Sequence, residues 1–108
     1  MNYLVTILLL ANMLTLQGDL HDMAVQAGVD PQLAACIVTN ESHWDTQLVG
    51  RDRDTGLFQI IPSTGEWAAG KLGYQEYDLL DPVTNMIFGL YILDNYPEWY
   101  STLYICQD

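Results

Sequence analysis

The chain has 108 residues, of which 50% are hydrophobic, and a net charge of −11 at pH 7. This length suits one small domain with a single core and leaves no room for a second catalytic domain. Only three residues are basic, so the chain lacks the positive surface that a nucleic-acid-binding protein needs. The same charge argues against docking on anionic lipid and is compatible with a neutral substrate.

The first segment, residues 1–18, is almost entirely apolar and uncharged from Tyr3 to Leu16. Its length suits the hydrophobic region of an export signal better than a membrane span. No Lys or Arg precedes the apolar run, and no A-x-A motif follows it. An export signal is the preferred interpretation, and a membrane anchor and a first core helix stay open as alternatives. Residues 19–108 are expected to form the folded domain.

Two helices are expected in the first part of this domain. Apolar residues at helical spacing predict a helix within residues 19–30, which ends at Gly28. Asp30 followed by Pro31 is a start signal for the next helix, over residues 31–42. That helix is apolar nearly all round, which predicts that it is buried.

The rest of the chain alternates between loops and helices. Residues 43–55 are polar and predict an irregular loop or short β-ribbon, and the apolar run at residues 56–61 would fit a strand by periodicity alone. Further helices are expected over residues 64–73, from Pro82 to a break at Pro97, and in a last short helix after it. The expected fold class is all-α, with about five helices and one irregular loop.

Glu41 is the candidate for chemistry, because it ends a helix that is expected to be buried. Burial and the negative end of the helix dipole both favour the protonated carboxyl. A general acid that works near neutral pH needs such an environment. The two histidines show no metal-ligand spacing with the cysteines, so no metal site is expected.

The two cysteines, Cys36 and Cys106, leave two interpretations open. In an exported protein they could form a disulfide that closes a long loop. They could equally be buried free thiols that behave as small hydrophobic groups.

Three segments together carry a family resemblance: GVDPQLAACIVTNESHWD, TGLFQIIPSTGEWAA and LLDPVTNMIFGLYIL. In order and spacing they resemble the catalytic domain of soluble lytic transglycosylases, in the lysozyme-like superfamily, over about residues 19 to 105. The resemblance implies a lysozyme-like all-α fold. It also implies cleavage of peptidoglycan glycan strands at the bond between N-acetylmuramic acid and N-acetylglucosamine. It implies no cofactor and no metal.

The resemblance also implies roles for single residues. Glu41 would be the only catalytic acid/base, and the product would carry a 1,6-anhydro ring. Ser42 would support the helix end close to the substrate, Gln59 would line the cleft, and Gly56 would let the backbone approach the sugar.

Aromatic side chains offer further candidates, since sugar rings stack on aromatic faces. Trp44, three residues after Glu41, is the preferred cleft candidate, whereas Trp67 and Trp99 are expected to serve packing. Tyr104 is the candidate for an aromatic hydroxyl near the site.

The chain departs from the family pattern at two places. A serine that the family often has in the active-site loop corresponds to Gly50 here. The family's Tyr-Asn block near the end corresponds to Cys106 and Gln107. Both departures are expected to affect the strength of any activity.

Asp54 opens a second hypothesis, because the segment DTGLFQI resembles animal-type lysozymes, in which an aspartate pairs with the catalytic acid. A hydrolytic muramidase using Glu41 and Asp54 is therefore an alternative. In another interpretation Asp54 is a loop residue paired with Arg51 or Arg53. An inactive glycan-binding remnant is the third hypothesis. Secretion, a place in the cell envelope, or a phage-encoded, bacteriolytic role would fit each enzyme.

Overall fold

The computed structural model describes residues 3–107, apart from the side chains of residues 3–6, 8–10 and 12. The described chain is helical and contains no strand longer than an isolated bridge. The elements are α1 (Tyr3–Ala27), α2 (Pro31–Ser42), α3 (Pro62–Leu72), α4 (Pro82–Asn95), the 3-10 helix η1 (Pro97–Trp99) and α5 (Leu103–Cys106). The all-α prediction is therefore confirmed.

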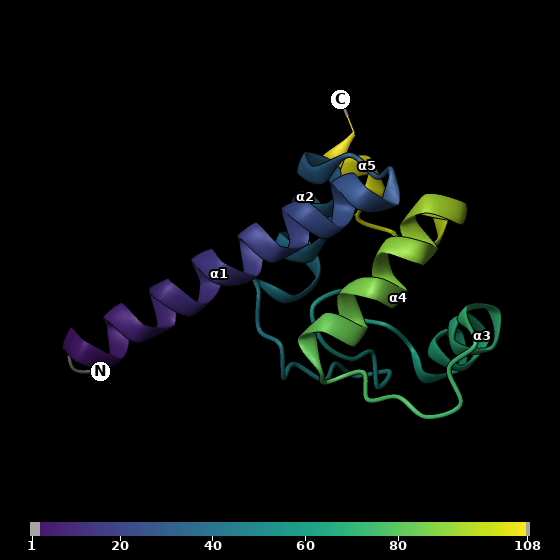
Figure 1. Cartoon of the computed structure of the whole chain (residues 1–108), viewed down its shortest axis with the longest axis horizontal. Coiled ribbons are helices and arrows are strands. Elements are labelled where there is room, and N and C mark those ends of the chain that lie inside the picture. Colours follow the sequence, from purple (N-terminus) through teal and green to yellow (C-terminus); the bar gives the residue numbers. More distant parts are fainter. Residues whose placement is uncertain (1–2, 108) are drawn as a thin grey trace.

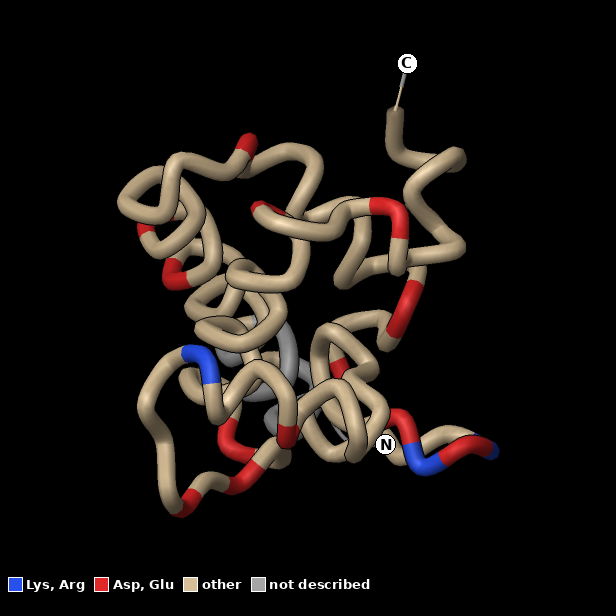
Figure 2. Tube along the Cα trace, turned by 90° about the vertical axis from the view of Figure 1, so that its right-hand side faces the viewer, with Lys and Arg blue, Asp and Glu red and all other residues tan. Residues whose placement is uncertain are grey.

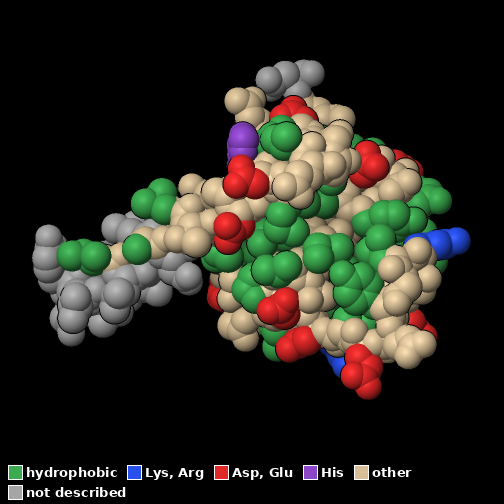
Figure 3. Space-filling view, viewed as in Figure 1, with side chains coloured by type: hydrophobic (Ala, Val, Ile, Leu, Met, Phe, Trp, Pro, Cys, Tyr) green, Lys and Arg blue, Asp and Glu red, His purple; other side chains and the backbone are tan. Residues whose placement is uncertain are grey.

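The helices surround one hydrophobic core, and α4 holds several of them together. Helix α4 packs against α1, α3 and η1, and α2 packs between α1 and α5. The N-terminal half of α1 extends away from this body (Figure 1). Hydrophobic side chains gather on the face of Figure 3 around α4 and the C-terminal half of α1. The largest buried side chains lie on four segments and meet in the centre: Leu20, Ile37, Val38, Leu57, Phe58, Met86 and Phe88.

The predicted start signals of α2 and α4 are confirmed. The Asp30 carboxylate accepts a hydrogen bond from the backbone amide of Gln32, at 2.9 Å. The Asp81 carboxylate accepts one from the amide of Thr84, at 3.0 Å. Each bond satisfies an amide of the first turn that has no partner within its helix, and a proline follows each aspartate.

The N-terminal segment continues directly into the first helix of the domain. Helix α1 passes through residue 18 without a break, and Leu16 and Leu20 are both buried in the core. Residues 1 and 2 lie outside the described residues, and the division at residue 18 stays a prediction. Among the described residues, no helix has both the length and the apolar character needed to cross a membrane.

The loop between α2 and α3 is irregular, as predicted. The apolar run at residues 56–61, which would fit a strand by periodicity alone, does not form one. Only two isolated bridges form there, Val49 with Thr55 and Thr55 with Ile60. Buried Asn85 of α4 replaces a strand partner. Its side-chain oxygen accepts from the Phe58 amide at 2.8 Å, and its nitrogen donates to the carbonyl oxygen of Thr55 at 2.9 Å. A core side chain thus shapes this loop.

The C-terminal segment is folded back onto α2. Pro97 follows the end of α4 as predicted, and α5 has only four residues. A disulfide joins Cys36 of α2 to Cys106 of α5, so the disulfide interpretation is the one that the structure supports. It anchors residues 100–102 beside the end of α2, where Glu41 lies.

Candidate active site

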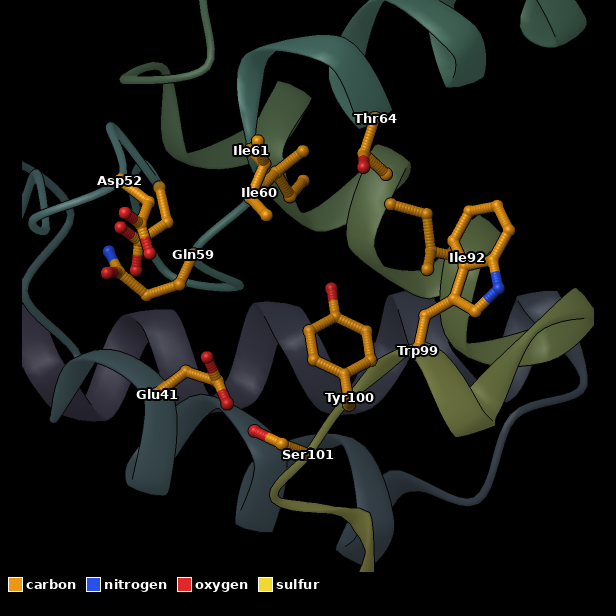
Figure 4. A pocket seen from close by; sticks show the side chains of 11 residues that line it. Glu41, Asp52, Gln59, Ile60, Ile61, Thr64, Ile92, Trp99, Tyr100 and Ser101 are labelled. Atoms are coloured by element: carbon orange, nitrogen blue, oxygen red, sulfur yellow. The ribbon is translucent and has the colours of Figure 1, made fainter.

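A pocket of about 400 Å³ opens where α2, the loop between α2 and α3, and the segment after α4 meet. Figure 4 shows Glu41 on one wall, Asp52 and Gln59 on the opposite wall, and Trp99 at the far end. The lining residues are Glu41, Asp52, Asp54, Gln59, Ile60, Ile61, Thr64, Ile92, Trp99, Tyr100 and Ser101.

Glu41 is half-buried on the wall formed by the last turn of α2. Burial raises the pKa of its carboxyl, and the negative charge of Asp54 raises it further. One contact acts in the opposite direction: the Thr102 hydroxyl donates a hydrogen bond to Glu41 Oε2 at 2.8 Å and lowers the pKa. Burial is the largest of the three effects, so the protonated carboxyl persists to higher pH than in an exposed glutamate.

Thr102 was not among the residues predicted from the sequence, and its contact gives a direct test. Thr102→Val removes the hydroxyl that favours the charged carboxylate, so the pKa of Glu41 should rise above its value in the parent protein. Titration of the Glu41 side chain by carbon NMR measures this shift. Thr102→Ser keeps a hydroxyl and should leave the pKa close to that of the parent. A pKa of Glu41 that stays the same or falls in Thr102→Val would show that the contact is not made in solution.

Tyr100 is a second residue that sequence reasoning missed. Its ring is buried, and its hydroxyl points into the pocket in Figure 4. Burial and, to a smaller degree, the charge of Glu41 raise the pKa of the phenol, so it stays neutral and remains a hydrogen-bond donor. Tyr100 therefore provides the aromatic hydroxyl near the site for which Tyr104 was the predicted candidate.

Asp54 lines the same pocket as Glu41, on the loop side. Neither Arg51 nor Arg53, both within the described chain, forms an ion pair with it, so the predicted pairing with an arginine is wrong. A Cβ at Gly50 would lie only 2.4 Å from Asp54 Oδ1. Gly50 thus makes room for the Asp54 carboxylate, which occupies the space that a serine side chain would need.

Gln59 lies in the pocket wall with its backbone in the left-handed region, at φ 47°. Its side-chain nitrogen donates to the carbonyl oxygens of Gly56 at 2.9 Å and Leu48 at 3.1 Å. Both amide hydrogens are therefore used within the protein, and only the side-chain oxygen is left to accept from a ligand. These two bonds hold the side chain in place on a backbone conformation that is uncommon for a residue other than glycine.

The structure explains why a glycine occupies position 56. Its φ is +77°, and a Cβ there would lie 2.3 Å from the side-chain nitrogen of Asn85. The close neighbour of Gly56 is thus the Asn85 side chain, and no part of the described structure places Gly56 in the pocket lining. Its predicted contact with the sugar stays a prediction without support from this geometry.

Three other predicted binding residues also lie outside the pocket lining within the described chain. Ser42 is buried and donates to the Val38 carbonyl oxygen at 3.1 Å, one turn back in α2. Trp44 is 8% exposed and donates to the Thr39 hydroxyl at 2.9 Å. Tyr104 is 79% exposed on α5. These positions give Ser42 and Trp44 a role in fixing the end of α2 and the turn after it.

From Asp19 to Glu98 the acidic residues are spread around the chain trace (Figure 2), and residues 3–18 contain none. In the described part of the chain, no group of three or more His, Cys, Asp or Glu side chains is arranged to hold a metal ion. The pocket itself contains three carboxylates and no cation. An anionic ligand would be repelled there, whereas neutral hydroxyl and amide groups would find both donors and acceptors.

The site thus combines two half-buried carboxyl groups, Glu41 and Asp54, with neutral side chains in one open pocket of an all-α fold. The sequence model of the family "Transglycosylase SLT domain" matches residues 20–106. The chain therefore belongs to this family. No curated protein matches the chain in sequence.

Solved structures agree with this family. The 70 kDa soluble lytic transglycosylase from Escherichia coli is 27% identical, with a TM-score of 0.63. A complex of the 70 kDa soluble lytic transglycosylase with bulgecin A is 26% identical, with a TM-score of 0.65. Each match covers 76% of this chain and 14% of the solved chain. The lysozyme-like fold expected from the sequence is thereby confirmed, and the chain corresponds to a small part of those larger proteins.

Proposed function

We propose that this domain is a lytic transglycosylase that cleaves the β-1,4 bond between N-acetylmuramic acid and N-acetylglucosamine in peptidoglycan, with Glu41 as the acid/base. The observation that carries the proposal is the position of Glu41: a half-buried carboxyl with a raised pKa, held by Thr102 in the wall of the pocket. Family membership and the two transglycosylase structures support the reaction class.

Glu41 performs both proton transfers of this reaction. The protonated carboxyl first gives its proton to the glycosidic oxygen, and the bond from this oxygen to C1 of the muramic sugar breaks. The resulting carboxylate then takes the proton of the C6 hydroxyl of the same sugar while that oxygen bonds to C1. A 1,6-anhydro ring forms, no water is consumed, and Glu41 is again protonated. The raised pKa suits this cycle, because the acid form must be available before each turnover.

The pocket supplies further groups for the substrate. The neutral Tyr100 hydroxyl can donate to a sugar oxygen, and the Gln59 side-chain oxygen can accept from a hydroxyl or from an N-acetyl amide. Ser101 also lines the pocket beside Tyr100. These neutral groups fit an uncharged glycan backbone.

Hydrolysis with Asp54 as a second carboxylate is the alternative, and one observation favours it. Asp54 lines the pocket and is close enough for its charge to raise the pKa of Glu41. A glycoside hydrolase uses such a pair of carboxylates, as nucleophile or as base for water.

Asp54→Asn separates the two functions. A transglycosylase should keep its rate within about tenfold, whereas a hydrolase that needs Asp54 should lose about 100-fold or more. Release of soluble fragments from purified peptidoglycan measures the rate. Asp52→Asn is the matched control, since it removes the same charge from a neighbouring position of the same pocket. A loss of about 100-fold in Asp54→Asn alone would contradict the transglycosylase proposal.

The place of action follows from the substrate. A peptidoglycan-cleaving enzyme works at the cell envelope or during phage lysis, and the apolar segment at residues 1–18 is proposed to direct export. Secretion and a bacteriolytic effect are part of this proposal.

A further inference from the structure

The far end of the active-site pocket is closed by an exposed tryptophan. Trp99 ends the 3-10 helix η1 and lines the pocket that contains Glu41, yet 50% of its surface stays exposed. In Figure 4 its indole stands beside Ile92 and Thr64, and Tyr100 separates it from Glu41. Exposure of a large aromatic side chain inside a pocket needs an explanation, because burial would remove more apolar surface from water.

The Trp99 indole is held rigidly by other aromatic rings. Tyr96 stacks on it with a ring distance of 4.5 Å and an angle of 12°, and Trp67 of α3 lies 5.1 Å away at 60°. Trp67 in turn contacts Tyr91 of α4 at 5.8 Å. Because Tyr96 and Trp67 pack against the Trp99 ring and Trp67 is joined to α4 through Tyr91, rotation of the Trp99 side chain is restricted. A ligand that packs on it pays little for ordering the ring.

The neighbours of Trp99 in the pocket are neutral. Ile92 and Thr64 stand beside the indole in Figure 4, while the lining carboxylates belong to α2 and to the loop before α3. A flat apolar face with an adjacent hydroxyl fits a pyranose ring, which presents C–H groups on its face and hydroxyls at its edge. Trp99 shares one pocket with Glu41, so the ring that it meets belongs to the same strand that Glu41 acts on.

We propose that Trp99, supported by Tyr96 and Trp67, is a stacking platform for a sugar ring of the glycan strand, separate from the ring at which Glu41 acts. The proposal rests on the proposed function for the nature of the ligand. It assigns substrate binding to Trp99, which the sequence placed among packing residues, in place of Trp44.

The test is a binding titration with the full-length chain carrying Glu41→Gln, so that the ligand is not consumed. The ligand is the β-1,4-linked tetramer of N-acetylglucosamine, and isothermal titration calorimetry reports binding, since its signal does not depend on the replaced indole. Trp99→Ala should weaken binding by about tenfold or more, and Trp99→Phe should stay within about threefold. Trp99→Leu keeps apolar surface but no flat ring, so it should bind as weakly as Trp99→Ala. Equal binding by the Leu variant and the Trp99 protein would overturn the platform, and so would absence of binding by the Trp99 protein.

A second measurement avoids the risk that a Trp99 variant misfolds. In the Glu41→Gln protein, N-bromosuccinimide should oxidise half-exposed Trp99 faster than Trp44, which is 8% exposed. Saturating tetramer should slow oxidation of Trp99 several-fold and leave that of Trp44 unchanged, as read by peptide mapping. Unchanged oxidation of Trp99 would overturn the proposal.

Failure of the platform and failure of the proposed function give different results. Binding that depends on Trp99, together with hydrolysed products or no products from the active protein, would contradict the transglycosylase alone. Anhydro products, together with binding that does not depend on Trp99, would contradict the platform alone.

Discussion

Replacing Glu41 by Gln should lower the rate of peptidoglycan cleavage by about 10²- to 10⁴-fold, the largest loss expected of any single substitution in this chain. The amide has the shape of the acid but cannot give a proton to the glycosidic oxygen or take one from the C6 hydroxyl. It can still accept the Thr102 hydrogen bond, so the pocket should keep its form. Fragment release from peptidoglycan measures the rate, with Asp52→Asn as the control.

The same substitution should raise stability at neutral pH. Burial raises the pKa of Glu41 in the folded protein above the ordinary value of 4.5. The folded protein therefore binds more protons than the unfolded chain between these two pKa values, and stability falls as pH rises through this window. Glu41→Gln removes that loss. Its melting temperature should equal that of the parent near pH 4 and exceed it at pH 7. A variant that is inactive but less stable at pH 7 would indicate damage to the fold.

Removal of the disulfide should cause the largest loss of stability. Cys36 and Cys106 are 70 residues apart, and closing a loop of this length is worth about 4 kcal/mol in the chain-entropy model. The double variant Cys36→Ala/Cys106→Ala should lose that free energy of unfolding, measured in urea. Activity should also fall, because the disulfide holds the segment with Thr102 and Tyr100 against α2.

Reduction of the parent protein provides the control for this prediction. A reductant should destabilise the parent to the level of the double variant and should leave the double variant unchanged. Equal stability of oxidised parent and double variant would contradict the structural role of the disulfide.

Local signals were enough to predict most helices. The Asp-Pro pairs at Asp30 and Asp81 mark the starts of α2 and α4, since an aspartate cap and a following proline act within one turn. The apolar run at residues 56–61 was ambiguous, because periodicity cannot distinguish a strand from a buried loop. Its conformation is set by Asn85, nearly 30 residues later, which no local pattern reveals.

The residues of the candidate site also divide into those that local sequence signals predicted and those that they did not. Glu41 was found because it ends a helix expected to be buried, Gln59 was found because it lies in a segment that resembles a family, and both line the pocket. Tyr100 and Trp99, which line the pocket, and Thr102, which bonds to Glu41, were missed as site residues, since only the return of the chain after α4 brings them there. Pro97 and the second cysteine were the visible signals of that return.

Two residues near Glu41 in sequence were predicted to lie at the substrate, but neither is part of the pocket lining. Ser42 and Trp44 follow Glu41 directly, but helix α2 ends between them and the chain turns at His43, whose φ is 53°. Ser42 thus points back into the helix and Trp44 packs against Thr39. Proximity in sequence at a helix end does not place side chains on one face.

The central claim is that Glu41 closes an anhydro ring without water, and the mass of the products tests it most directly. Purified peptidoglycan would be digested with the full-length protein and the soluble fragments analysed by mass spectrometry. A lytic transglycosylase should release fragments that are one water lighter than the corresponding hydrolysis products, and Glu41→Gln should release none. Fragments with ordinary reducing ends would contradict it and would assign the reaction to Glu41 and Asp54 as a hydrolytic pair.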